Sequence, residues 1–325
     1  MSFFSILLAL LIEQARPLKA GNRLEHITAA WMDWTTRTFD AGERRQAWVT
    51  WSLLVGIPAL AILLLEWLLG LAIGWPAMLA WHVAVLYATL GFRQFSHHFT
   101  AIRDALEAGD EDKARQLLAT WQNVQVGQIP RSEIVRHVIE HSVLAAHRHV
   151  FGVLMWFALM SVIGLGPGGA VVYTLAGKIQ RQWPQSPLHD PVISPVLASV
   201  AQRAWRFLDW LPARATALAF AVVGRFEDAM DGWRHHAQQF PDDNDGVILA
   251  ATAGAIDIRL GGAALHTPEV DVLSETQPAG TQATETTPGR TPELAHFAQV
   301  VGLVWRTVVL WLVLVALLTM ANLLG

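Results

Sequence analysis

Long apolar runs alternate with polar segments along this chain, a pattern typical of helices that cross a membrane. The run from Trp48 to Ile73 exceeds the roughly 20 residues that a helix needs to cross a bilayer. Pro58 predicts a kink inside it, and the apolar segment from Pro76 to Phe92 returns after a Gly-Trp-Pro turn. A last apolar run extends from Gln299 to Leu324. The pattern therefore predicts an all-α, polytopic integral membrane protein.

The polar segments on either side of the first apolar pair are basic. Segment 13–47 holds six Lys or Arg residues and segment 93–148 holds seven, whereas the apolar pair between them holds none. Because basic residues collect on the cytoplasmic side of a membrane, both flanks are predicted to lie in the cytoplasm. Within 99–149 apolar residues recur at helical spacing on both sides of an Ala-Gly-Asp turn, which predicts a cytoplasmic helical segment.

Three other segments depart from this pattern. Phe3 to Ile12 is apolar but too short to span a bilayer, so the N-terminus is predicted to be interfacial. The run from Gly164 to Gly169 either bends a membrane segment tightly or cradles a phosphate at a helix start. Residues 266–292 are rich in Thr, Pro, Glu and Gln and lack aromatic rings, which predicts disorder. The predicted segments are interfacial helices in 1–47, a transmembrane hairpin in 48–92, a cytoplasmic helical segment in 93–149, a membrane-associated core in 150–262, a disordered linker in 263–295 and a C-terminal transmembrane helix in 296–325.

The composition agrees with a membrane protein and narrows the partners. Hydrophobic residues make up 53% of the 325 residues and charged residues 15%, against about 25% charged residues in soluble domains. The formal net charge is −4 and no basic stripe is present, so nucleic acid is not an expected partner. Because the chain has no cysteine, disulfides, thiolate metal sites and thiol nucleophiles are excluded.

The strongest chemical signal is an arginine inside an apolar segment. Arg214 follows Pro212, and its larger neighbours from 215 to 223 are Ala, Leu, Phe and Val. A guanidinium in such a place is costly unless it reaches an interface, a wet cavity or an acidic partner. Its planar fork suits a phosphate or a carboxylate, and it equally suits a structural cap on nearby carbonyls and aspartates. The sequence leaves both interpretations open.

Other polar residues give weaker signals. Glu66 is the one charge in its apolar run, and its carboxylate is expected to be satisfied or interfacial rather than a proton relay. Asp257 and Arg259 either pair locally or line one site. His137 and His141 lie four residues apart, as zinc ligands on one helix do. Since no third ligand follows at motif spacing, they are expected on a solvated or interfacial helix face, and no metal site is predicted.

Three groups of residues between positions 100 and 262 form motifs. They are Ala105-Leu106-Glu107-Ala108-Gly109-Asp110 with Ala114-Arg115, then Pro212-Ala213-Arg214-Ala215-Thr216-Ala217, and then Asn244-Asp245-Gly246 with Ala253-Gly254-Ala255 and Leu260-Gly261-Gly262. They resemble the helix hairpin, the Pro-Ala-Arg-Leu-Thr-Ala motif and the glycine-rich signature of the CobD/CbiB family of cobalamin-biosynthesis membrane proteins. The glycine-rich signature is the most specific of the three because it keeps the family's spacing.

The resemblance implies a multi-pass protein of the bacterial inner membrane. Family members join an aminopropanol-phosphate to the corrinoid adenosylcobyric acid with ATP, forming an amide at the membrane. The implied partners are the membrane and a corrinoid or phosphorylated small molecule, and ATP with magnesium is expected only for an active ligase. Arg214, Asn244, Arg259 and Asp257 are the implied ligand-binding residues, and Glu140 is the implied catalytic acid.

Three family motifs are altered in this chain. Gly-Arg-Asp-Thr appears as Gly127-Gln128-Ile129-Pro130, Glu-Asn-x-x-Asp-Gly keeps only Glu140, and Thr-Leu-Asp appears as Thr174-Leu175-Ala176. An ATP-dependent ligation needs carboxylates that hold magnesium across the phosphates. Because three acidic positions are apolar, amide or missing, the chain is expected to be a divergent member.

The N-terminal half supports a second hypothesis. Glu13 to Trp34, and Leu208-Asp209-Trp210-Leu211-Pro212, resemble AmpE, a related inner-membrane protein implicated in signalling β-lactamase induction. AmpE-like proteins share the architecture and lack the same acids. The first hypothesis is therefore a divergent CobD/CbiB-like protein of cobalamin biosynthesis. The alternative is a non-catalytic, AmpE-like signalling modulator that acts through a protein partner.

Overall fold

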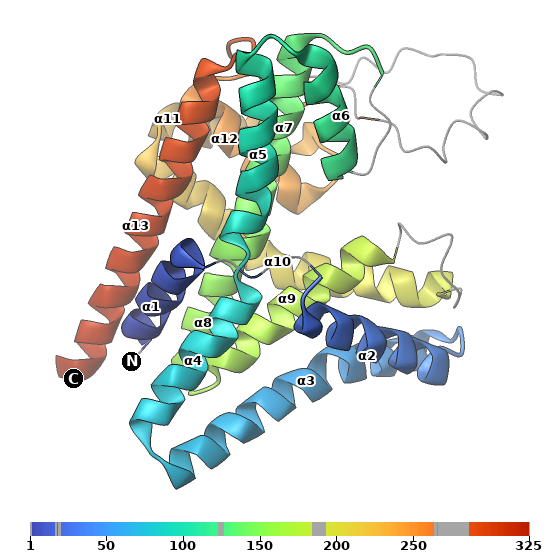
Figure 1. Cartoon of the computed structure of the whole chain (residues 1–325), viewed down its shortest axis with the longest axis vertical. Coiled ribbons are helices and arrows are strands. Elements are labelled where there is room, and N and C mark those ends of the chain that lie inside the picture. Colours follow the sequence, from blue (N-terminus) through green and yellow to red (C-terminus); the bar gives the residue numbers. More distant parts are fainter. Residues whose placement is uncertain are drawn as a thin grey trace. The chain divides into compact units, whose positions relative to one another are not determined.

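A computed structural model describes residues 2–16, 18, 21–122, 127–183, 193–262, 265 and 286–324. All regular elements in these ranges are helical, which confirms the all-α class (Figure 1). The elements are α1 (Ser2–Ala15), α2 (Arg23–Phe39), α3 (Arg44–Ala72), α4 (Trp75–Thr89), α5 (Phe92–Glu107), α6 (Glu111–Gln122), α7 (Arg131–Ala146), the π-helix η1 (His147–Phe151), α8 (Gly152–Ser161), α9 (Gly166–Gln182), α10 (Pro195–Val223), α11 (Phe226–His236), the 3₁₀ turn η2 (Ala237–Gln239), α12 (Asp243–Ile256) and α13 (Ala295–Leu324).

The chain forms two compact units, which are described separately. Unit 1 comprises Met1–Gln94, His147–Pro212 and Trp311–Gly325, and unit 2 comprises Phe95–Ala146 and Ala213–Leu310. Helices α10 and α13 contribute residues to both units.

Among the described residues, three helical stretches are long and apolar enough to cross a membrane, namely Arg44–Ala72, Arg131–Ser161 and Ala295–Ala321. The first and the last correspond to apolar runs in the sequence, and together the three confirm a multi-pass membrane protein. The second stretch joins α7, η1 and α8 without a break. The sequence placed a segment boundary after residue 149, but the structure has a π-helical turn there rather than a helix end.

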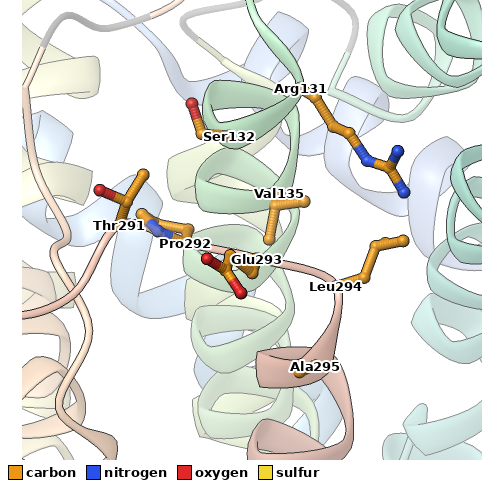
Figure 2. A pocket seen from close by; sticks show the side chains of 8 residues that line it. All are labelled: Arg131, Ser132, Val135, Thr291, Pro292, Glu293, Leu294 and Ala295. Carbon is orange, nitrogen blue, oxygen red and sulfur yellow. The ribbon is translucent and has the colours of Figure 1, made fainter.

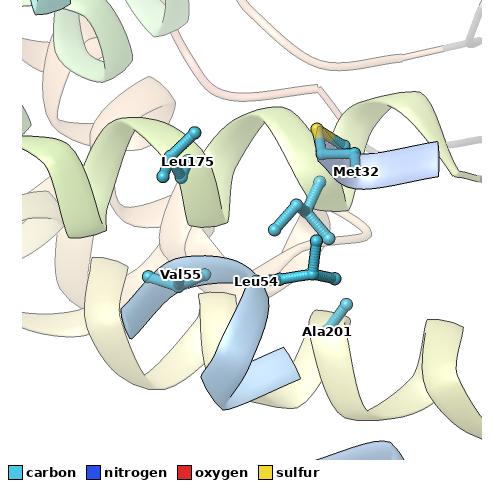
Figure 3. Close-up of a cluster of buried hydrophobic side chains, with 6 residues drawn as sticks. Met32, Leu54, Val55, Leu175 and Ala201 are labelled. Atoms are coloured by element: carbon cyan, nitrogen blue, oxygen red, sulfur yellow. The ribbon is translucent and has the colours of Figure 1, made fainter. Parts of the chain in front are cut away.

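In unit 1, α9 packs against α3, α4 and α8, while α1 packs against α4. Figure 3 shows a buried cluster formed by Met32 from α2, Leu54 and Val55 from α3, Leu175 from α9 and Ala201 from α10. Full burial of one large apolar side chain contributes about 1.5–3 kcal/mol. The cluster therefore holds the neighbouring helices α2 and α3 against α9 and α10, which come more than 90 residues later in the sequence.

Tryptophan side chains compensate both prolines that lie inside helices of unit 1. A proline has no N–H, so the carbonyl four residues earlier loses its helical donor. Before Pro58 of α3 this carbonyl belongs to Leu54, and the indole N–H of Trp31 donates to it at 3.0 Å. Trp156 does the same at 3.1 Å for the carbonyl four residues before Pro212 in α10. Each tryptophan satisfies a carbonyl that the proline leaves without a helical donor, and it ties a neighbouring helix to that point.

The glycine run after α8 is a close-packed turn. Gly164 has a φ of 79°, which favours glycine, and α9 begins at Gly166. A Cβ at Gly169 would lie 2.5 Å from the carbonyl oxygen of Trp156, so α8 and α9 approach closely there. Of the two alternatives that the sequence left open, the structure therefore has the tight bend.

In unit 2, glycines allow α11 to lie along α12. A Cβ at Gly232 of α11 would lie 2.5 Å from the carbonyl oxygen of Ala250, and a Cβ at Gly254 of α12 would overlap the carbonyl oxygen of Asp228. Gly246, Ala250 and Gly254 recur at every fourth position, so small residues line one face of α12. This spacing gives the glycine-rich signature a role in helix packing.

Most of the predicted linker, including 266–285, lies outside the described residues. The part of the predicted linker that the structure does describe from residue 286 onward pairs with the segment after α12, where Ile258 bridges Arg290 and Gly261 bridges Thr286. The entry into α13 is therefore fixed against the end of the glycine-rich signature.

Candidate functional site

Arg214 and Asn244 form a side-chain pair in unit 2. Asp242 caps α12, because its Oδ1 accepts the backbone N–H of Asn244 at 2.9 Å. Asn244 is thereby fixed in the first turn of α12, where it is 1% exposed. Arg214 of α10 donates from Nη1 to Asn244 Oδ1 at 3.0 Å. The guanidinium therefore has a side-chain amide as its partner at the start of α12.

Glu140 is held by an arginine and by a backbone amide in unit 2. Arg136, one turn earlier on α7, donates from Nη1 to Glu140 Oε1 at 3.0 Å and to Oε2 at 3.2 Å. The amide of Gly261 donates to Oε1 at 2.7 Å. Gly261 and Gly262 have φ values of 84° and 102°, which favour glycine. The paired glycines of the signature therefore present an amide to Glu140, whose catalytic role stays a prediction.

Asp257 and Arg259 lie beyond the other end of α12. Asp257 ends the helix with a left-handed φ of 56°, and its Oδ2 lies 3.1 Å from Arg225 Nη1 and 3.2 Å from Arg290 Nε. The Arg259 side chain is exposed, and no ion pair joins it to Asp257 within the described ranges. Along the helix Asp257 is about 20 Å from Asn244. The structure thus brings together two of the four implied ligand-binding residues and separates Asp257 from them.

A fully buried polar network in unit 1 was missed by the sequence analysis. Asp209 Oδ1 accepts the Tyr173 hydroxyl at 2.6 Å and lies 2.8 Å from His147 Nε2. His147 and Asp209 are both 0% exposed, and His147 begins the π-helical turn η1. A Cβ at Gly152 would overlap the Tyr173 hydroxyl, so glycine is needed for the ring to reach Asp209. The network joins η1, α9 and α10 through groups that would be costly to bury alone.

Glu66 is paired in unit 1. Its Oε1 lies 2.6 Å from Nε2 of His82, and both side chains are buried. Glu66 Oε2 and His82 Nδ1 are buried and have no hydrogen-bond partner among the described residues. One oxygen of the Glu66 carboxylate therefore ties α3 to α4, which agrees with only part of the satisfied or interfacial carboxylate that the sequence favoured.

Among the residues that the structure describes, no set of side chains forms a site for the magnesium that an active ligase would need with ATP. Within the ranges that the structure covers, no group of three His, Asp or Glu side chains is placed to hold a metal ion. Glu140 already accepts hydrogen bonds from Arg136 and Gly261. The His137 ring lies beside Arg136, with Nε2 at 2.9 Å from Nη2. We derive no step through ATP or magnesium.

An open pocket of about 400 Å³ lies where α7 begins and the chain enters α13 (Figure 2). Arg131, Ser132 and Val135 line one side of it, and residues 291–295 line the other. The guanidinium of Arg131 donates to the Leu106 carbonyl at 2.9 Å. The pocket contains none of the implied site residues, and its lining cation is engaged, so we do not favour it as the functional site.

Comparison with known proteins gives consistent matches. The family model described as CobD/Cbib protein matches residues 7–179, more than half of the 325 residues. The cobalamin biosynthesis protein CobD of Stutzerimonas stutzeri is 29% identical over 324 residues, which cover 95% of each chain. The protein of the same name from Chromobacterium violaceum is 30% identical and covers 70% of this chain and 67% of its own. No solved structure matches this chain.

The Stutzerimonas match extends over almost the whole chain, including the N-terminal part that resembles AmpE. The AmpE resemblance therefore stays a prediction, since the proteins that match over this part are named CobD. Because the family model covers more than half of the residues, the chain belongs to the CobD/CbiB family.

Proposed function

We propose that this protein works in the bacterial inner membrane at the amide-forming step of cobalamin biosynthesis. In this step the amine of an aminopropanol phosphate is joined to a carboxylate of adenosylcobyric acid. The observation that carries the proposal is membership of the CobD/CbiB family, with a match over 95% of a relative named cobalamin biosynthesis protein. The apolar helices and the basic flanks of the first hairpin support placement in a membrane with cytoplasmic flanks.

The Arg214–Asn244 pair supports the binding part of this role. Both substrates of the step carry anionic groups, and a guanidinium binds phosphate or carboxylate with two parallel hydrogen bonds. We assign Arg214 and Asn244 to binding and orienting an anionic substrate. Glu140, whose catalytic role stays a prediction, accepts the Gly261 amide and so holds the glycine pair in place.

Growth rescue tests the proposed step. A bacterium that lacks its own CobD/CbiB protein cannot make the amide, so we expect expression of this chain to restore cobalamin-dependent growth on cobyric acid. The strain with an empty vector and the strain with its own gene restored are the controls. The measurement is the growth rate on cobyric acid, with membrane expression confirmed by immunoblot.

Absence of rescue despite confirmed membrane expression would overturn the ligation role. That result would favour the non-catalytic, AmpE-like signalling role, which the altered acidic positions of the sequence motivate.

Replacing Arg214 with lysine separates recognition from architecture. Lysine keeps the charge but loses the planar fork, so we expect Arg214→Lys to fold and to lose growth rescue. The lost hydrogen bond to Asn244 should lower the free energy of unfolding by only about 0.5–1.5 kcal/mol. The exposed Arg203, also on α10, gives the matched control Arg203→Lys. Unchanged rescue by Arg214→Lys would show that the fork is not needed for the substrate.

A further inference from the structure

Unit 1 contains a cavity of about 350 Å³ that none of the implied site residues line. It is bordered by the start of α2, the part of α3 around Pro58, the end of α4, and α9. Pro58, Ala61, Ile62 and Val171 supply much of its apolar wall. Small-molecule sites are concave and mostly apolar, with a few polar groups that fix orientation. The cavity has this character.

Lys178 is the lysine that lines this cavity. It lies half-buried on α9 and makes no hydrogen bond or ion pair with any residue that the structure describes. Burial lowers the pKa of its ammonium, although the charge of Glu25 opposes this shift. Because a partly desolvated cation without a partner is costly, Lys178 marks a place that an anion would stabilise.

Glu25 supplies the opposite charge on the same cavity. It lies in the first turn of α2, where its Oε2 accepts the backbone N–H of Gly21 at 2.7 Å. Its own N–H donates to the cap residue Asn22 at 2.9 Å. These bonds fix its position, and no ion pair within 4.0 Å joins it to Lys178 among the described side chains. The two charges face one cavity without neutralising each other directly.

Three threonine hydroxyls add acceptors to the lining. Thr28, Thr89 and Thr174 each donate to a carbonyl of their own helix at 2.9 Å. A hydroxyl has one donor and two lone pairs, so these oxygens can still accept from a ligand. The cavity thus offers one cation for an anionic group, and a carboxylate with hydroxyl oxygens for an ammonium group.

We propose that this cavity binds the phosphate and the amine of an amino-alcohol phosphate, with the phosphate at Lys178 and the ammonium at Glu25. At roughly 30 Å³ per water, the space holds about a dozen water-sized groups, which suits a small molecule and excludes a corrinoid macrocycle. That the ligand is the amine substrate rests on the proposed function. That the cavity binds a molecule with a phosphate and an ammonium group rests on the cavity itself. Two sources carry the same chemistry, a soluble aminoalkyl phosphate and the headgroup of phosphatidylethanolamine.

Calorimetry on the full chain in nanodiscs of phosphatidylcholine and phosphatidylglycerol tests the site. The probes are O-phosphoethanolamine and inorganic phosphate. Lys178→Gln should lower the affinity for both probes at least about tenfold, because each probe loses a charge-assisted hydrogen bond. Glu25→Gln should weaken O-phosphoethanolamine by a similar factor and leave inorganic phosphate unchanged. The exposed residues Lys113 and Glu227 give the matched controls Lys113→Gln and Glu227→Gln, which should change neither affinity.

Two further measurements cover a variant that does not fold and distinguish the two sources of the ligand. Lys178→Arg keeps the charge and should retain binding, so it replaces Lys178→Gln if that variant does not fold by circular dichroism. Adding phosphatidylethanolamine to the nanodisc should lower the affinity for O-phosphoethanolamine if the lipid headgroup occupies the site. It should leave this affinity unchanged if the ligand is soluble. Equal probe affinity in folded wild type, Lys178→Gln and Glu25→Gln would overturn the proposal. No corrinoid is present, so failure here is distinct from failure of growth rescue.

Discussion

Replacing Asp209 with alanine is expected to lower the free energy of unfolding by about 3–5 kcal/mol, the usual cost of removing one partner of a buried pair. The change leaves the Tyr173 hydroxyl and the His147 ring without their acceptor in a region closed to water. Tyr173→Phe removes only one donor to the carboxylate and should cost about 1.5–3 kcal/mol. Unfolding in mixed detergent micelles, followed by tryptophan fluorescence, measures both.

The control for this series is an exposed aspartate that also pairs with a histidine. Asp231 Oδ1 lies 2.9 Å from His235 Nδ1 at the surface of α11. Asp231→Ala should change stability by no more than about 0.5 kcal/mol. If Asp209→Ala were as mild as this control, the buried network would not be a stabilising element of unit 1.

Replacing Gly254 with leucine is expected to separate α11 from α12 and to cost at least about 3 kcal/mol, the upper part of the range for overpacked cores. A Cβ there would overlap the carbonyl oxygen of Asp228, which is backbone and cannot rotate away. Because α12 also positions Asn244, the Arg214 pair should be lost with the packing. Thermal unfolding and limited proteolysis of the purified protein measure the effect.

Gly302 provides the matched control, since it is also a helical glycine but has open space where a Cβ would lie. Gly302→Leu should be neutral or stabilising by up to about 1 kcal/mol, because leucine forms helix better than glycine. Similar losses in both variants would mean that the cost arises from leucine itself rather than from the α11–α12 contact.

The helical class and the long apolar spans could be predicted because they depend on local hydropathy. The sequence also predicted a kink at Pro58, but it did not predict which group would bond to the carbonyl that the proline leaves without a donor. The indole N–H that satisfies the Leu54 carbonyl comes from Trp31 on another helix. Tryptophans in a membrane protein suggest interfacial anchoring from composition alone, and only tertiary structure shows that one of them completes a broken helix.

The candidate site was partly predictable. Arg214 was singled out because it is a charged residue in an apolar segment. Asp209 lies in the same stretch, and its charge is equally costly to bury without a partner. Its partners His147 and Tyr173 are distant in sequence, so the network became visible only in three dimensions. Asp257 was grouped with Asn244 by motif, whereas the length of α12 separates them.

Lys178 and Glu25 were beyond the reach of sequence patterns. Neither belongs to the three motifs that resemble the CobD/CbiB family, and each is an ordinary polar residue in its own helix. The packing of α2, α3, α4 and α9 brings them to one cavity, and this packing is a tertiary feature. A charge without a partner is informative only once its neighbours are known.

Whether this protein acts at the amide-forming step is tested most directly by following the amide product in the growth-rescue experiment. Corrinoids from cells lacking their own CobD/CbiB protein, but expressing this chain and fed cobyric acid, are analysed by mass spectrometry. We expect a corrinoid that carries the aminopropanol phosphate in amide linkage, and we expect this corrinoid to be absent from the empty-vector strain. Unmodified cobyric acid alone, in cells whose membranes contain the protein, would contradict it.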